Sequence, residues 1–120
     1  MSERAVILFA HGSGDPLWKR PIEAVAERLR VLRPQTRVAC AYLERDTPDL
    51  ASAANDLVLS GIRQLTVLPM FLGIGRHARD DLPLLVHALR RTHPGLQIEL
   101  RRAVGEDQRV LDLLARIASE

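Results

Sequence analysis

The sequence predicts an α/β fold in which a four-stranded parallel sheet lies between layers of helices. Two observations support this three-layer α/β/α architecture. Four short apolar segments alternate with four segments that carry apolar residues at helical spacing. The first segment, AVILFA at 5–10, is apolar throughout, as in strands covered on both faces. Because no linker or composition shift interrupts the pattern, we expect one domain over residues 1–120.

The expected strands cover residues 5–10, 37–43, 64–70 and 96–100. The first of them ends at the turn sequence HGSGDP. Each strand is followed by a segment with apolar residues at helical spacing, which predicts four helices. In chain order, the apolar residues of these helices are Ile22, Val25, Leu29 and Leu32 in the first, Leu50, Ala54 and Leu57 in the second, Leu82, Leu85, Val86 and Leu89 in the third, and Val110, Leu113, Leu114 and Ile117 in the fourth. For the second helix we expect Thr47 as the N-cap, Pro48 in the first turn and Gly61 at the end.

Composition excludes several classes of function. Aromatic residues make up 3% of the chain and the net charge is only +2, with no run of basic residues, so nucleic acid is not an expected partner. The N-terminal apolar run is too short for a signal peptide, and no segment approaches membrane-spanning length. The single cysteine, Cys40, has no disulfide partner and is expected in the core. These features predict a soluble, cytoplasmic protein with no membrane partner.

Three polar side chains follow successive strands. His11 follows the first strand, Glu44 the second, and His77 lies beyond the third in a glycine-containing loop. The intervals from 11 to 44 and from 44 to 77 are both 33 residues, about one strand-helix unit. Parallel sheets bind ligands at the carboxyl ends of their strands. Two imidazoles and one carboxylate suit a divalent transition metal and leave coordination positions open.

Each of these residues also has a purely structural interpretation. His11 could be a turn residue, Glu44 a solvated charge, and His77 the first histidine of a helix. Their recurrence at one sheet edge favours a metal or catalytic site. His87 and His93 are expected on the surface of the third helix. The glycines of HGSG could contact a phosphate, but that motif is too short to be specific.

The segments AHGS, AYLE followed by PDL, and PMFLGIGRHARDDLP together resemble the small class II chelatases, the short CbiX-like sirohydrochlorin chelatases. The similarity includes PGLQIEL and VGED and so extends over nearly the whole chain. It implies the chelatase-like fold and insertion of cobalt, or of iron or nickel, into sirohydrochlorin during cobalamin or siroheme synthesis. It also implies that His11, Glu44 and His77 handle the metal and the protons. Many relatives carry a basic residue where this chain has Gly14.

Sirohydrochlorin is a flat apolar ring that bears carboxylates, so it requires an apolar surface with cations at the rim. The expected surface residues are Met70, Phe71, Leu72 and Ile74, the expected cations are Arg45, Arg76 and Arg79, and Ser13 of the first motif is a further expected contact. Gly73 and Gly75 would allow the loop to move and admit the ring. No organic cofactor is expected.

Other activities fit the sequence less well. A phosphohistidine-type phosphatase requires an arginine before the first histidine, where this chain has Ala10, and no G-x-S-x-G elbow of a hydrolase is present. A non-catalytic metal carrier or sensor would use the same ligands and stays open. The ligand set also leaves open which first-row metal is used. Because one sheet edge offers only one wall to a macrocycle, we expect a homodimer.

Overall fold

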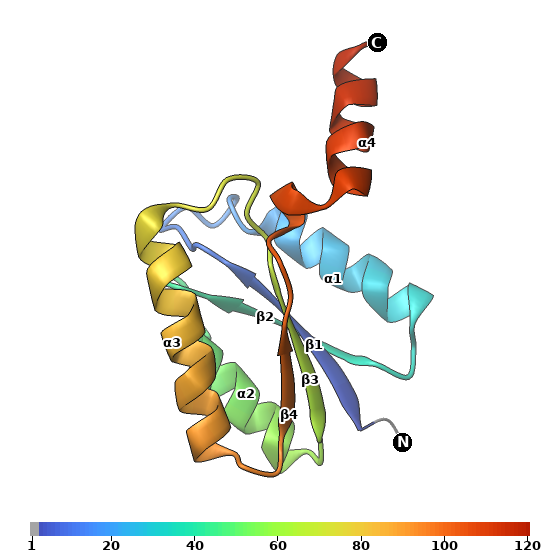
Figure 1. The fold of residues 1–120 in the computed structure, drawn as a ribbon. Helices are drawn as coiled ribbons and strands as arrows, with labels where there is room; N and C mark the ends of the chain where they lie inside the picture. The colour runs from blue at the N-terminus through green and yellow to red at the C-terminus, as the bar shows by residue number, and fades with distance from the viewer. Residues whose placement is uncertain (1–2) are drawn as a thin grey trace.

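The computed structural model describes residues 3–120 and contains one four-stranded parallel sheet with the strand order β2-β1-β3-β4 (Figure 1). The strands are β1 (Arg4–Ala10), β2 (Arg37–Tyr42), β3 (Gln64–Pro69) and β4 (Gln97–Leu100), and the helices are α1 (Arg20–Leu32), α2 (Leu50–Leu59), α3 (Arg76–Thr92), the short 3₁₀ helix η1 (Val104–Glu106) and α4 (Gln108–Ala118). The predicted fold class is therefore confirmed. No helix within residues 3–120 has the length and apolar character needed to span a membrane.

The main core lies between the sheet and the pair α2 and α3. Ile7 and Phe9 of the central strand β1 are fully buried there, together with Val67 of β3. Helix α3 contributes Leu82 and Val86 at helical spacing. Since the next residues along β1 point to the opposite face, that strand needs apolar residues at consecutive positions. This explains the uninterrupted run at 5–10.

The start of α2 differs from the expectation. Asp49, not Thr47, is the N-cap, and its carboxylate accepts a hydrogen bond from the Ser52 N–H at 2.8 Å. Pro48 stays outside the helix because its carbonyl oxygen accepts from the Tyr42 N–H at 3.0 Å, which joins this loop to the end of β2. The helix therefore begins at Leu50. A carboxylate at the N-cap satisfies one of the free N–H groups of the first turn.

Helix α3 begins earlier than its apolar stripe indicates. It starts at Arg76 after the N-cap Gly75, so His77 is its second residue and does not precede the helix. Pro83 lies inside the helix without ending it. The buried stripe of the helix begins at Ala78 and continues through Leu82, Val86 and Leu89, so the small Ala78 is the part of the stripe that the sequence analysis did not include.

Helix α4 leaves the body of the molecule and points away from the sheet (Figure 1). None of its residues is buried. On the face of the sheet opposite α2 and α3, α1 packs over β2 and β1. The part of the chain that the structure describes shows no comparable packing of α1 or α4 on β3 and β4.

Candidate metal and tetrapyrrole site

His11 and Glu44 lie side by side at the carboxyl edge of the sheet. Nε2 of His11 is 3.3 Å from Oε1 of Glu44, and each side chain is about half exposed, at 52% and 53%. The parallel pairing of β1 with β2 continues past the strand ends, where Leu43 N–H donates to Ala10 O and Glu44 N–H donates to His11 O. The sheet register therefore brings the two residues together. Both side chains remain open to a ligand from solvent.

Gly12 allows the close approach of the two loops. Its φ is +98°, and a Cβ atom placed there would lie 1.7 Å from the carbonyl oxygen of Glu44. No side chain fits that space, and the left-handed φ adds a second reason for glycine. The glycine of the first motif therefore sets the separation of His11 and Glu44.

Asp46 links the same two loops through hydrogen bonds. Its Oδ2 accepts from the Ser13 N–H at 3.0 Å, and its Oδ1 lies 3.7 Å from Nζ of Lys19. The Ser13 hydroxyl accepts from the Asp15 N–H at 3.1 Å. Ser13 thus has a structural role in the loop after His11. Sequence reasoning missed Asp46 because nothing in its spacing separates it from an ordinary loop carboxylate.

Tyr42 forms an apolar support beneath this pair of loops. It is 3% exposed, and its ring makes an edge contact with Trp18, with 6.4 Å between the ring centroids. Lys19 Nζ lies 6.0 Å from the same ring. Burial is the main cause that raises the pKa of Tyr42 to about 12, so the phenol stays protonated at neutral pH. The Tyr42 phenol therefore does not serve as a proton acceptor at neutral pH.

His77 lies in the first turn of α3 and is exposed. The structure does not bring it into contact with His11 or Glu44. Within residues 3–120, no group of three or more His, Cys, Asp or Glu side chains is close enough to hold a metal ion. The structure thus assembles two of the three predicted ligands, His11 and Glu44, and does not bring His77 to them.

The apolar loop before α3 is only partly available to a ligand. Phe71 is 8% exposed and packs edge-on against Phe9, with 6.2 Å between the ring centroids. It belongs to the core and does not offer the open surface that the sequence suggested, because its ring fills space above β1. Leu72 is 64% exposed and is the accessible apolar side chain of the loop. Met70 and Ile74 are half-buried.

The glycines and arginines of the loops are accessible. A Cβ atom at Gly73 or Gly75 would meet nothing within 4 Å, so both positions border open space. Arg76 and Arg79 are exposed in the first turn of α3. Arg45 is exposed beside Glu44 and has a φ of +64°. All three cations are accessible to a ligand.

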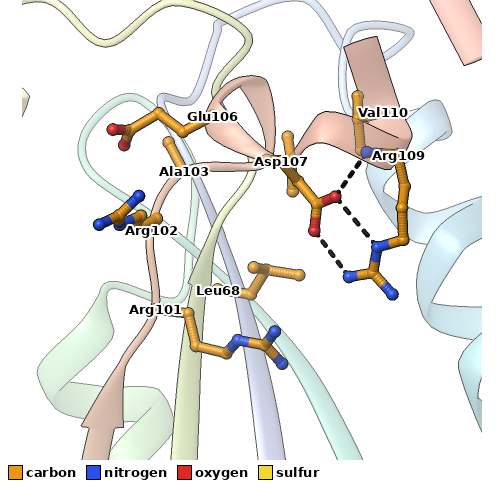
Figure 2. Close-up of a pocket in the computed structure, with 9 residues that line it drawn as sticks. Leu68, Arg101, Arg102, Ala103, Glu106, Asp107, Arg109 and Val110 are labelled. Carbon is orange, nitrogen blue, oxygen red and sulfur yellow. Dashed lines mark hydrogen bonds and ion pairs between the residues drawn. The ribbon is translucent and has the colours of Figure 1, made fainter. Parts of the chain in front are cut away.

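A hollow of about 420 Å³ lies where β4 leads into η1 and α4 (Figure 2). Arg101 and Arg102 contribute to its lining and point to opposite sides of the chain. The carboxylate of Asp107 accepts hydrogen bonds from the backbone N–H and the guanidinium of Arg109. These bonds lower the pKa of Asp107 to about 2.

Comparison with known proteins identifies the family. A family model described as CbiX matches residues 5–120. The chain belongs to the CbiX family. The solved structure of a CbiX protein from Marinobacter aquaeolei is 33% identical in sequence to this chain and has a TM-score of 0.83. The match covers 97% of this chain and 94% of the Marinobacter protein.

Two further relatives complete the comparison. The sirohydrochlorin cobaltochelatase of Sulfolobus acidocaldarius is 28% identical over 115 residues, which are 96% of the CbiX-family chain and 89% of that protein. The sirohydrochlorin chelatase SirB of Bacillus subtilis subspecies spizizenii, solved in complex with cobalt, shares the fold with a TM-score of 0.82 at 20% identity. That match covers 99% of this chain and 50% of SirB, so SirB is about twice as long.

Proposed function

We propose that this chain inserts a divalent metal, with cobalt as the favoured ion, into sirohydrochlorin. Its CbiX membership supports the reaction class, and the sirohydrochlorin cobaltochelatases among its relatives support the substrate and the metal. The observation that carries the proposal is the His11–Glu44 pair, an imidazole and a carboxylate 3.3 Å apart at an accessible sheet edge. Cobalt insertion points to cobalamin synthesis as the use of the product, with siroheme synthesis as the use if iron is inserted.

The reaction requires a site that holds a metal loosely and also accepts protons. Two pyrrole N–H groups lose their protons while all four ring nitrogens bind the metal, so the ring gains the ion and the solution gains two protons. His11 and Glu44 provide one nitrogen and one oxygen ligand. Because both side chains are exposed, a metal bound to them can exchange its remaining ligands with water. A neutral imidazole or a carboxylate can take a pyrrole proton when the metal leaves it. His77 provides the third ligand when the loop over 70–75 closes.

The accessible part of that loop is suited to a flat ring. Leu72 offers the most exposed apolar side chain, with Met70 and Ile74 beside it in sequence. Gly73 and Gly75 give the backbone freedom to move, and they border open space. Ring carboxylates would meet the exposed cations Arg45, Arg76 and Arg79. Ser13 acts indirectly, because its N–H holds Asp46 and so maintains the loop after His11.

Two copies of the chain would bind the macrocycle better than one. The apolar loop and the His11–Glu44 pair lie at one open edge, whereas a bound macrocycle is normally enclosed on several sides. We therefore propose a homodimer in which the second copy supplies the opposite wall of the cleft.

The proposal is tested by anaerobic incubation of the purified protein with sirohydrochlorin and cobalt, iron or nickel in turn. The expected result is a change in the absorption spectrum of the ring at a rate that depends on protein concentration, fastest with cobalt. Tight metal binding without any metalated ring would instead identify a metal carrier or sensor that uses the same pair of ligands.

A further inference from the structure

The loop that continues from His11 into α1 carries an exposed apolar pair. Leu17 is 57% exposed, and Trp18, the single tryptophan of the chain, is 38% exposed. Tryptophan is highly buried on average, because its side chain has a large apolar surface. A tryptophan that keeps more than a third of its surface open next to a ligand-binding edge is a candidate contact for a flat apolar ligand.

Hydrogen bonds along this loop fix the backbone between the first motif and Trp18. The Ser13 hydroxyl accepts from the Asp15 N–H at 3.1 Å, and the Asp15 carboxylate accepts from the Leu17 N–H at 2.9 Å. The Asp15 carbonyl oxygen accepts in turn from the Trp18 N–H at 3.1 Å. Serine and aspartate side chains that bond to backbone N–H groups two residues later stabilise tight turns. The loop therefore holds Trp18 in place before a ligand binds.

The indole ring is also held from the side of β2. It makes an edge contact with Tyr42, with 6.4 Å between the ring centroids. The Tyr42 side chain begins next to the first motif, since a Cβ atom placed on Gly12 would lie 3.4 Å from the Tyr42 Cβ. Lys19, the residue after Trp18, contacts the loop after β2 through the 3.7 Å distance between its Nζ and Asp46 Oδ1. A side chain that is already ordered loses little conformational freedom when a ligand packs on it.

Exposed apolar side chains reach the candidate site from two neighbouring loops. Leu17 and Trp18 follow β1, whereas Leu72 follows β3, which pairs with β1. Both loops lie at the same end of the sheet (Figure 1). Glu44 follows β2, which pairs with β1 on its other side. A ring that lies over this edge can therefore contact apolar side chains from both loops while it faces the His11–Glu44 pair.

We propose that Trp18 is a ring-binding residue of the sirohydrochlorin site, with the exposed part of its indole packed against the macrocycle and Leu17 beside it. This inference rests on the proposed function, because it takes sirohydrochlorin as the ligand of this edge. The macrocycle is flat and conjugated, and an indole gives it a large, rigid contact area. Because the contact is the same before and during metal transfer, Trp18 contributes to the affinity for the ring and not to the chemical step.

The indole N–H of Trp18 provides a direct readout. The chain has one tryptophan and therefore one indole signal in a nitrogen–proton correlation spectrum of the labelled protein. Metal-free sirohydrochlorin is added anaerobically to the wild-type protein without any metal, so that no turnover takes place. The ring current of the macrocycle should shift the indole signal by more than its linewidth. A signal that stays in place while the ring binds would overturn the proposal.

Substitutions separate a ring contact from a purely structural role. Trp18→Ala should raise the dissociation constant for metal-free sirohydrochlorin about 10- to 100-fold, whereas Trp18→Phe should raise it no more than about threefold. In the cobalt assay, Trp18→Ala should raise KM and leave kcat close to the wild-type value. Leu59→Ala is the control, because Leu59 is 78% exposed at the last residue of α2, and it should keep the wild-type affinity. Thermal unfolding checks that each variant is folded.

The outcomes distinguish this inference from the proposed function. Metal insertion by Trp18→Ala with the wild-type KM would overturn the inference and leave the proposed function intact. Ring binding that depends on Trp18, in a protein that inserts no metal, would support the inference and contradict the proposed function. A wild-type protein that binds no ring would overturn both.

Discussion

The distance between His11 and Glu44 depends on a residue that has no chemistry of its own. Gly12 has a φ of +98° and leaves less than 2 Å between a hypothetical Cβ and the Glu44 carbonyl oxygen. Asp46 supports the same arrangement by accepting from the Ser13 N–H. The candidate ligands are therefore positioned by the backbone and by a largely buried carboxylate, while their own side chains stay accessible.

Replacing either residue of the pair should impair metal insertion without affecting folding. We expect His11→Ala to lower the initial rate at least about 100-fold, since it removes a ligand and a proton acceptor. Glu44→Gln should be slower than wild type but measurable, because the amide keeps the shape and loses the charge. His87→Ala, on the exposed side of α3, serves as the control. A wild-type rate for His11→Ala would refute the assignment, and thermal unfolding would confirm that each variant is folded.

Gly12→Ala should destabilise the protein by about 3 kcal/mol, because it combines a strained φ with an overlap against backbone. The expected change in Tm is about 10 °C. Gly14→Ala is the matched control, since a Cβ atom there meets nothing within 4 Å, and its Tm should stay close to that of wild type. Equal melting temperatures for the two variants would show that the loops after β1 and β2 can move apart without loss of stability. The contact between Gly12 and Glu44 would then not define the site.

At the scale of elements, the connection from β4 to α4 is docked against the loop that follows β3. Gly105 lies against the backbone of Leu72, and its N–H donates to Phe71 O. The buried Phe71 packs in turn on Phe9 of β1. The apolar loop over 70–75 is thus attached to the core at its first part and free at its glycines. This division fits a loop whose second part moves.

Gly105→Ala should separate η1 from this loop. An added Cβ atom would lie 1.6 Å from Leu72 O, so we expect a loss of at least about 2 kcal/mol in the free energy of unfolding. The substitution should also increase hydrogen exchange at the backbone N–H of residue 105, which in the wild type donates to Phe71 O. Gly73→Ala, which borders open space, should cost less than about 1 kcal/mol in the same urea titration. A Gly105→Ala protein as stable as wild type would mean that the contact of η1 with the loop after β3 does not contribute to stability.

In the molecule as a whole, the candidate ligands lie at or near one open edge of the sheet. The sheet edge carries His11 and Glu44, and the first turn of α3 carries His77. β1 and β3 are neighbours in the sheet, so the two histidines follow adjacent strands of the same chain. We therefore expect the metal ligands to come from one copy, with the second copy supplying only the wall of the ring site.

Mixing inactive variants tests this expectation. His11→Ala and His77→Ala proteins, unfolded and refolded together, should form mixed dimers that stay inactive, because neither copy has both histidines. A site built from the His11 of one copy and the His77 of the other would recover about a quarter of the wild-type rate, because half of the dimers would contain one intact site. The absorbance assay with cobalt and sirohydrochlorin measures the difference. Recovery near that level would assign the metal site to two chains.

The sequence alone determined the order of the elements and the edge at which the candidate ligands meet. Apolar runs and helical spacing located the four strands and the four α-helices, but not the short helix η1, and the parallel sheet placed His11 and Glu44 side by side because their strands are paired in register. Such patterns are local, and burial of one helix stripe or two sheet faces imposes them directly. Resemblance in the motifs then indicated the family, which the comparison confirmed.

The paths of the loops and of the last helix follow from tertiary contacts that no local pattern contains. It buried Phe71 against Phe9, made Asp49 the cap of α2, joined Asp46 to Ser13, and turned α4 away from its own sheet. Each outcome depends on contacts between residues far apart in the chain, and loop paths follow from where backbone groups find partners. An amphipathic pattern indicates that a helix can cover an apolar surface, but it carries no information on which surface that is.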